Sequence, residues 1–286
     1  MHIIATQELS ASQQEEVEEL EQWAKEEEGL QGRLFLSNRL NTDPDIPCFF
    51  LGYEHNRLVS FLCAFFPTDE EAEFSGYTHP RFRSRGHFSA LVEQALTEYA
   101  SLPFKQILFT AEATSASGQA YLASRYPHIE RSEYLMLLRR DEYKPQKASG
   151  TLRVVDRMNR EEAARMMSLI FEGSLEKSRD RMLVMLMQEG RRVFIHYHDD
   201  RPVGVFNAQF EEPSSYKIYG VGVLKEERSH GYGTAMMRQG IDVLFLDATE
   251  LTLEVESTNE HAIALYTALG FRPVMQVDYH RLPFSL

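Results

Sequence analysis

The chain carries a glycine-rich turn of the kind that binds phosphate groups. Residues 227–234 read Glu-Arg-Ser-His-Gly-Tyr-Gly-Thr and follow a strand-like run at 219–223. Gly231 and Gly233 leave the backbone without Cβ atoms where the strand gives way to a helix-like run, and Arg228 adds a fixed positive charge. Unpaired N–H groups at a helix N-terminus bind phosphate or pyrophosphate. The turn therefore predicts an anion site, although such turns are also common as purely structural features.

Two other glycine-rich phosphate motifs fail to match this turn. A dinucleotide-binding turn needs a third glycine, and Met236 occupies that position. A P-loop needs Gly-Lys followed by Ser or Thr, which this turn lacks. The anion that the turn binds is therefore expected to belong to another class of ligand.

A second run of residues downstream identifies that class. It joins an asparagine, a tyrosine and a Gly-Phe pair at helical spacings, in the order Asn259, Ala262, Tyr266, Gly270 and Phe271. Together with the glycine-rich turn, this run resembles the acetyl-CoA site of the GNAT (Gcn5-related) N-acetyltransferase superfamily. The resemblance implies acetyl-CoA as the acyl donor, with the pyrophosphate held by backbone N–H groups and the pantetheine arm held by backbone groups of the preceding strand. The residues implied in cofactor binding are Val221, Val223, Arg228, Ser229, His230, Gly231, Tyr232, Gly233, Thr234 and Asn259.

Tyr266 matches the usual general acid of this family, which donates a proton to the departing thiolate. Helical spacing alone places Tyr266 on one face with Ala262 and Leu269, as expected of a core tyrosine. The matched context favours the catalytic role. Because a tyrosine with a pKa near ~10 is a weaker acid than a thiol near ~8.5, we expect Tyr266 to act mostly as a hydrogen-bond donor.

Glu254 is the candidate general base. It lies in a run where Leu251, Leu253 and Val255 alternate with polar residues, so it occupies the polar face of a strand. Its position twelve residues before Tyr266 resembles the glutamate–tyrosine pair of the N-terminal alanine acetyltransferases that act on ribosomal proteins. A solvent-facing glutamate explains the pattern equally well, and both interpretations stay open.

The chain contains the pattern twice. The run around Arg57 is echoed around Arg201, and Arg83-x-x-Gly86 is echoed by Arg228-x-x-Gly231, at offsets of 144 and 145 residues. A nearly constant offset over separate motifs indicates a duplicated domain. The first copy departs from the family pattern: Phe88 replaces Gly233, Ser115 replaces Asn259 and Leu122 falls opposite Tyr266.

Strand and helix patterns alternate in each half, which predicts an α/β (α+β) fold. The resemblance implies two tandem GNAT domains, each a mixed, mostly antiparallel twisted sheet flanked by helices, with the fourth and fifth strands splayed to admit the pantetheine arm. The expected boundaries are 1–140 for a degenerate N-terminal GNAT domain, 141–150 for a linker, and 151–286 for a catalytic C-terminal domain. Methionines crowd the two helices before Val193, where they suit either an acceptor pocket or ordinary packing.

The composition excludes several classes of protein. Of 286 residues, 43% are hydrophobic and 26% are charged, which is ordinary for a globular protein, and no apolar run is long enough to span a membrane. A net charge of −13 argues against nucleic acid as a partner. The two cysteines and the absence of a signal-peptide pattern lead us to expect a cytoplasmic location. His196 and His198 occupy a strand and turn that have a repeat partner, so we expect no metal site.

The leading hypothesis is an acetyl-CoA-dependent N-acetyltransferase with its active site in the C-terminal domain. Its acceptor would be a primary amine of a small molecule or a peptide. Two alternatives stay open: a non-catalytic, regulatory acyl-CoA-binding module, and a tandem GNAT enzyme that acetylates a mycothiol-like thiol precursor. The fold cannot choose the acceptor. The sequence also leaves open whether the chain is a monomer or a homodimer.

Overall fold

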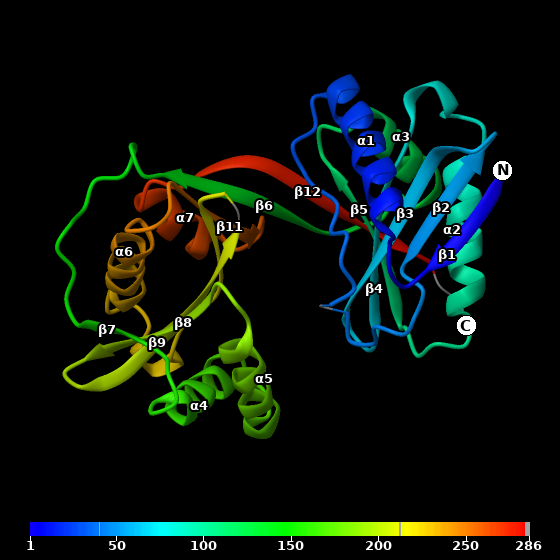
Figure 1. Ribbon diagram of the computed structural model, residues 1–286. Helices are drawn as coiled ribbons and strands as arrows, with labels where there is room; N and C mark the ends of the chain where they lie inside the picture. The colour runs from blue at the N-terminus through cyan, green and yellow to red at the C-terminus, as the bar shows by residue number, and fades with distance from the viewer. Residues whose placement is uncertain (40, 212, 284–286) are drawn as a thin grey trace. The chain divides into compact units, whose positions relative to one another are not determined.

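The computed structural model describes residues 1–39, 41–211 and 213–283, and its contacts divide the chain into two units. Unit 1 comprises Met1–Glu133 with Met275–Leu286, and unit 2 comprises Tyr134–Val274. Seven α-helices and twelve strands lie in the described residues (Figure 1). The predicted α/β class, with helices flanking mostly antiparallel sheets, is confirmed.

Unit 1 contains three α-helices, five whole strands and parts of two more. Its elements are β1 (His2–Thr6), α1 (Ala11–Glu28), β2 (Phe49–Glu54), β3 (Arg57–Thr68), β4 (Glu71–Thr78), α2 (His87–Tyr99), β5 (Gln106–Glu112), α3 (Ala116–Arg125), the start of β6 (Ile129–Arg139) and the end of β12 (Arg272–Leu282). The strands from β1 to β5 are neighbours in chain order, and β12 follows β5. β4 and β5 run parallel, whereas β12 pairs antiparallel with β5.

Unit 2 repeats this plan with an added helix. Its elements are the end of β6, β7 (Thr151–Val154), α4 (Arg160–Ile170), α5 (Leu175–Met187), β8 (Arg191–His198), β9 (Arg201–Glu211), β10 (Ser215–Val223), α6 (Tyr232–Leu244), β11 (Glu250–Glu256), α7 (Glu260–Ala268) and the start of β12. The strand order is β6-β11-β10-β9-β8-β7. β10 and β11 run parallel, and the hairpins from β7 to β10 are antiparallel.

Two hydrophobic clusters cover the opposite faces of the unit 2 sheet. Residues of α6 and α7, including Met236 and Tyr266, pack on one face with the alternate residues Leu251, Leu253 and Val255 of β11. Residues of α4 and α5 pack on the other face with Val205 of β9. The buried methionines of these two helices are Met166, Met167, Met182 and Met185. Packing therefore accounts for most of the methionines in this region.

Two strands run through both units. β6 begins in unit 1 and ends in unit 2, while β12 begins in unit 2 and ends in unit 1 (Figure 1). The segment 141–150 holds no helix or strand, and it lies within unit 2, between β6 and β7. The chain thus passes from unit to unit inside strands, so this division differs from the boundaries that the sequence predicts.

Asp278 secures the end of β12 within unit 1. Its carboxylate accepts hydrogen bonds from Gln119 of α3 at 3.1 Å, from Ser132 of β6 at 2.7 Å and from Gln276 at 2.8 Å. Asp278 is buried, and a buried carboxylate needs such donors to offset its lost hydration. The last strand is therefore an integral part of unit 1.

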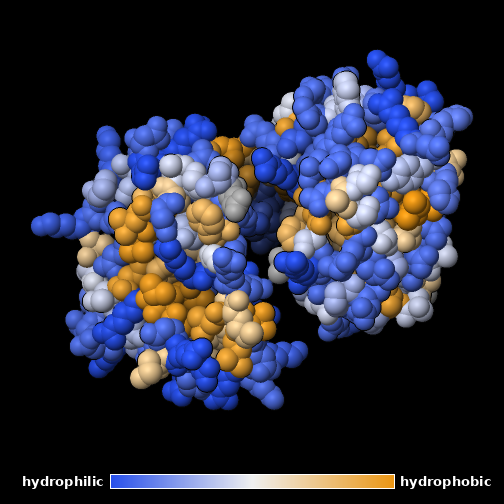
Figure 2. Space-filling model, in the orientation of Figure 1, coloured by the Kyte–Doolittle hydropathy of each residue, from blue (hydrophilic) through white to orange (hydrophobic). Residues whose placement is uncertain are grey.

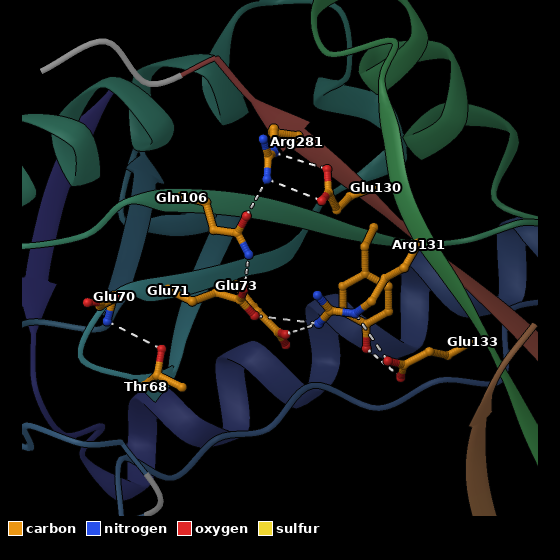
Figure 3. Close-up of polar contacts among 10 residues, drawn as sticks. Thr68, Glu70, Glu71, Glu73, Gln106, Glu130, Arg131, Glu133 and Arg281 are labelled. Atoms are coloured by element: carbon orange, nitrogen blue, oxygen red, sulfur yellow. Dashed lines mark hydrogen bonds and ion pairs between the residues drawn. The ribbon is translucent and has the colours of Figure 1, made fainter. Parts of the chain in front are cut away.

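A partly buried charge cluster lies on the sheet of unit 1 (Figure 3). Arg131 of β6 forms ion pairs with Glu73 at 2.6 Å, Glu71 at 3.6 Å and Glu133 at 3.2 Å, and its guanidinium lies 4.0 Å from the ring centre of Tyr279. Three carboxylates thus share one guanidinium. Burial raises the pKa of Glu73 to about 7; Arg131 opposes the rise, and Glu71 and Glu133 add to it.

This raised pKa predicts that unit 1 loses stability as the pH rises from 4.5 to about 7, because the unfolded chain releases the Glu73 proton in this window while the folded unit retains it. Glu73→Gln cannot ionise, and Arg131 keeps two partners. We expect the variant to raise the free energy of unfolding at pH 8 by about 1–3 kcal/mol and to leave it nearly unchanged at pH 4. Urea unfolding followed by fluorescence of Trp23, the only tryptophan and part of unit 1, measures the change.

The control is Glu70→Gln, which removes an exposed carboxylate paired with Lys105. It should have little effect at either pH, since exposed ion pairs contribute little. Equal pH dependence in the wild type and Glu73→Gln would contradict the assignment.

Candidate functional site

The candidate site lies where β10 and β11 of unit 2 separate. The two strands pair from Ser215–Ile218 to Glu250–Leu253, and beyond this ladder β10 continues to Val223. β10 is irregular between Tyr219 and Gly222, and Gly220 has a φ of +57°. The predicted splay between the fourth and fifth strands of this domain is therefore present.

Apolar side chains of α4 line the irregular end of β10. A Cβ atom on Gly222 would lie 2.2 Å from Ile170 Cγ2 and 3.4 Å from Phe171 Cζ, so only glycine fits here without a shift of the neighbours. Phe171 is 47% exposed and Leu169 is 59% exposed. Figure 2 shows hydrophobic side chains gathered on the visible face of unit 2. A ligand with an apolar arm would find contacts on this surface.

The glycine-rich turn leads from β10 into α6 with open backbone donors. Ser229 has a φ of +65°, and Gly231, with a φ of +80°, caps α6 without a side-chain hydrogen bond. The first helical hydrogen bond runs from the Ala235 N–H to the Gly231 carbonyl, at 3.0 Å. In the described residues, no acceptor takes the N–H groups of 229–234. These groups therefore form an anion-binding concavity at the positive end of a helix.

Arg228 adds an uncompensated charge to this turn. Its Nε donates to the Val223 carbonyl at 3.2 Å, which fixes the side chain against β10. Within the described chain, no carboxylate forms an ion pair with Arg228. Its remaining guanidinium donors are available to an anion.

Aromatic rings and a surface cavity flank the turn. The ring of Tyr232 stacks between His198, at 4.5 Å, and His230, at 5.6 Å between centroids. The cavity is lined by His198, Asp199, Arg201, Val203, Glu227 and Tyr232. The rings of His230 and Tyr232 therefore lie at the side of the turn. The hydrogen-bond donors available to an anion are the backbone N–H groups.

Helix α7 brings the second motif to the turn. Asn259 caps α7 by accepting a hydrogen bond from the Ala262 N–H at 3.1 Å. Leu265 of α7 and Val223 of β10 both lie in van der Waals range of a Cβ built on Gly233, at 3.8 and 3.6 Å. The structure thus gathers the strand, the turn and the helix of the two motifs around one place.

Tyr266 lies on this helix with its ring buried. It is 7% exposed and packs edge-on against Phe271, with ring centroids 6.0 Å apart. Val221 and Val223 pack against the same hydrophobic cluster. The hydroxyl forms no hydrogen bond with any described residue. Burial raises the pKa of Tyr266 to about 12, so the hydroxyl stays protonated at neutral pH and suits a hydrogen-bond donor better than an acid.

Glu254 lies on the opposite face of the sheet. Leu253 and Val255 point into the cluster that holds Tyr266, so the alternating strand directs Glu254 away from it. Its side chain is 47% exposed and forms an ion pair with Lys217 of β10 at 2.8 Å. The two predicted catalytic side chains therefore lie on opposite faces of the sheet.

The sequence analysis overlooked three polar residues of this region, Arg191, Asn207 and Tyr219. Asn207 interrupts the apolar run of β9 and faces Tyr219 across the ladder, next to the irregularity of β10. An amide within an apolar strand was the available signal. No cluster of three or more His, Cys, Asp or Glu residues suited to a metal ion occurs in the described ranges.

Comparisons with known proteins give a family match for part of the chain. Residues 158–271 match the profile of the Acetyltransferase (GNAT) family. The matched residues lie within unit 2. No curated protein sequence matches the chain.

Solved structures extend the likeness to both units. A GCN5-related N-acetyltransferase from Sphaerobacter thermophilus is 17% identical, with a TM-score of 0.78 over 98% of this chain and 95% of its own. A tandem GNAT protein from the clavulanic acid biosynthesis pathway is 17% identical, with a TM-score of 0.71 over 98% of each chain. A GNAT-family acetyltransferase from Colwellia psychrerythraea is 11% identical, with a TM-score of 0.70 over 99% of this chain and 100% of its own. At these identities the likeness establishes the tandem fold.

The position of Glu254 generates a test of its role. If it accepts the amine proton, Glu254→Gln should lower kcat/KM for acetyl transfer by about 10²-fold. Initial rates of thiol release between pH 6 and 9 measure this effect.

Glu256→Gln, a substitution on the same face of β11, is the matched control and should leave kcat/KM unchanged. A kcat/KM that is the same in the wild type and Glu254→Gln would remove Glu254 from the mechanism.

Proposed function

We propose that the chain is an acetyl-CoA-dependent N-acetyltransferase whose active site lies in unit 2. The acceptor is a primary amine of a small molecule or a peptide. The open backbone donors of the turn, the uncompensated Arg228 and the gap between β10 and β11 suit the pyrophosphate and the extended arm of acetyl-CoA. When bound, acetyl-CoA supplies the activated acetyl thioester.

The proposal places the active site in unit 2 because two equivalent arginines differ in their partners. In unit 1, Arg83 Nε donates to the Thr78 carbonyl at 3.3 Å, as Arg228 Nε does to Val223. The turn that follows has the same backbone form, with φ values of +61° at Ser84 and +81° at Gly86. Both units therefore retain the same anion-binding geometry.

Among the described residues, a carboxylate of the protein pairs with this arginine in unit 1 and not in unit 2. Glu28, the last residue of α1, forms an ion pair with Arg83 and accepts hydrogen bonds from Ser115 Oγ at 2.9 Å and the Ser117 N–H at 3.3 Å. Its side chain is 9% exposed. Burial tends to raise the pKa of Glu28, but the hydrogen bonds from Ser117 and Ser115 and the charge of Arg83 outweigh it and lower the pKa. Glu28 is thus a stable internal carboxylate.

Further contacts in unit 1 join the elements that correspond to those of the candidate site in unit 2. Glu112, at the end of β5, accepts hydrogen bonds from the N–H groups of Gln31 at 3.0 Å and Gly32 at 2.7 Å. The ring of Phe88, at the position of Gly233, packs edge-on against Tyr121 with centroids 5.3 Å apart. The segment after α1 therefore spans the end of β5, and an aromatic pair joins α2 to α3. These contacts support a structural role for unit 1.

In the proposed reaction, each group of unit 2 has a separate role. Backbone donors of the turn and Arg228 hold the phosphates, and the exposed edge of β10 at Val221 and Val223 orients the arm. Glu254 accepts the amine proton on one face. Tyr266 donates a hydrogen bond to the departing sulfur on the other. Such positioning and charge stabilisation account for most of the acceleration of acyl transfer.

The location of the enzyme is part of the proposal. Cys48 and Cys63 are free, buried thiols, and burial raises the pKa of both. Free buried thiols are typical of reducing compartments, which supports the cytoplasm. None of the described helices is long and apolar enough to cross a membrane.

Tyr266→Phe tests catalysis directly. Removing the hydroxyl should lower kcat by about 10–10²-fold, because it removes one donor to the developing thiolate. The Kd for acetyl-CoA should change little. Since the pKa of Tyr266 is about 12, its ionisation should cause no decline in the wild-type rate up to pH 10. Steady-state kinetics and calorimetric titration provide both readouts.

Tyr143→Phe is the control, because the Tyr143 hydroxyl contacts the Arg238 carbonyl and has no proposed role. Unaltered turnover in Tyr266→Phe would exclude Tyr266 as the donor. Binding of acetyl-CoA without turnover in the wild type would favour an acyl-CoA-binding module instead.

The arginine comparison predicts the stoichiometry of cofactor binding. The wild type should bind one acetyl-CoA per chain in calorimetric titration. Arg228→Gln should raise the Kd by at least about tenfold through loss of a charge-assisted contact. Arg83→Gln, the matched substitution in unit 1, should leave the Kd and the stoichiometry unchanged. Two sites per chain, or weaker binding in Arg83→Gln, would contradict the proposal that unit 1 is closed.

A further inference from the structure

Arg191 is a cation without an acidic partner on the sheet face that carries Glu254. It begins β8, and its Nε donates to Gln209 Oε1 of β9 at 3.1 Å. Its guanidinium lies 5.2 Å from the ring centre of Tyr219 on β10. In the described chain, no carboxylate forms an ion pair with it. The outer donors of the guanidinium remain available.

Strand register connects Arg191 to the predicted base. Arg191 pairs with Gln209, and Gln209 pairs with Lys217, so the three side chains lie on one face of neighbouring strands. Lys217 is neutralised by Glu254 at 2.8 Å. Of the two cations in this row, Lys217 therefore has a carboxylate partner and Arg191 has none among the described residues.

Two buried polar atoms without partners lie beside Arg191. Asn207 is 1% exposed; its Nδ2 donates to the Tyr219 carbonyl at 3.4 Å, and its Oδ1 has no partner. The Tyr219 hydroxyl is likewise buried without a partner. Unsatisfied buried polar groups are rare in proteins, so each needs an explanation. Both lie next to the irregular stretch from Tyr219 to Gly222, where the gap between the strands opens.

The equivalent pair in unit 1 has no such unsatisfied atoms. Cys63 and Ser75 face each other across β3 and β4, as Asn207 and Tyr219 do across β9 and β10. The Cys63 sulfur and the Ser75 hydroxyl lie 3.0 Å apart and satisfy each other. The unit with the open cofactor turn is thus also the unit with unused polar groups on the acceptor side.

We propose that Arg191 binds a carboxylate of the acceptor, so that the substrate is an amine that also carries a carboxylate, such as an amino acid. The inference rests on the proposed function and specifies its acceptor. A guanidinium fork matches a carboxylate in shape. Asn207 and Tyr219 offer an acceptor and a donor for other polar groups of the same molecule, and the amine points toward Glu254.

The test compares α-amino acids with their primary amides as acceptors. The two members of each pair share a side chain and an amine and differ only in the anionic group. In the wild type, KM should be about tenfold or more lower for the carboxylate member, and Arg191→Gln should remove this difference mainly through KM. Arg191→Lys, which keeps the charge but loses the fork, should restore part of it.

Arg192→Gln is the matched control. The Arg192 side chain lies on the opposite face of β8, where it stacks over Tyr216 and pairs with Asp247. It should leave the preference intact. A second readout is independent of turnover: CoA-saturated protein should bind N-acetyl amino acids, and Arg191→Gln should weaken this binding, while their N-acetyl amides should bind weakly to both.

The outcomes separate this inference from the proposed function. Equal use of amino acids and amides, unaffected by Arg191→Gln, would overturn the carboxylate site and leave the acetyltransferase intact. A preference for amines that carry phosphate would also overturn it. Absence of binding by any carboxylate to the CoA-saturated protein would overturn it as well, whereas failure of acetyl-CoA itself to bind would reject the proposed function.

Discussion

The candidate site depends on the early end of the ladder between β10 and β11. Because β10 and β11 are parallel neighbours that pair over only four residues, their carboxyl ends diverge. The irregularity between Tyr219 and Gly222 keeps the ends apart and leaves backbone groups of β10 outside the sheet. Everything that suits acetyl-CoA follows from this separation: the strand edge and the turn that enters α6. A continued ladder would leave no room for a ligand.

The two units show how one backbone serves two purposes. Their turns have nearly identical backbone angles, and their arginines are anchored in the same way. The difference lies in what meets the arginine: a carboxylate from α1 in unit 1, and no acidic group of the described chain in unit 2. An arginine that pairs with a carboxylate of its own unit stabilises that unit. An arginine without such a partner leaves hydrogen-bond donors unsatisfied and its positive charge unbalanced. This contrast matches the usual opposition between stability and function at binding sites.

Local signals in the sequence predicted much of this arrangement. Gly231 and Gly233 indicated a turn with bare backbone between a strand and a helix, the spacing from Asn259 to Tyr266 indicated a helix, and the alternation around Glu254 indicated its face. Long-range partners were beyond reach. Glu28 and Ser115 are 87 residues apart, and Ser132 and Asp278 are 146 apart, so no local pattern connects them. Arg191 likewise gains its meaning only from the register of three strands. The exchange of β6 and β12 between units was missed because each strand looks ordinary in its own sequence.

The passage of β6 and β12 between the units has a consequence for folding during synthesis. Unit 2 is one uninterrupted segment, whereas unit 1 needs the last residues of the chain to complete its sheet beside β5. On the ribosome, the half that is made first therefore finishes last, with an unpaired strand edge exposed while the other half is synthesised. Unpaired edges invite wrong pairing, so unit 1 is the half at greater risk of it during synthesis.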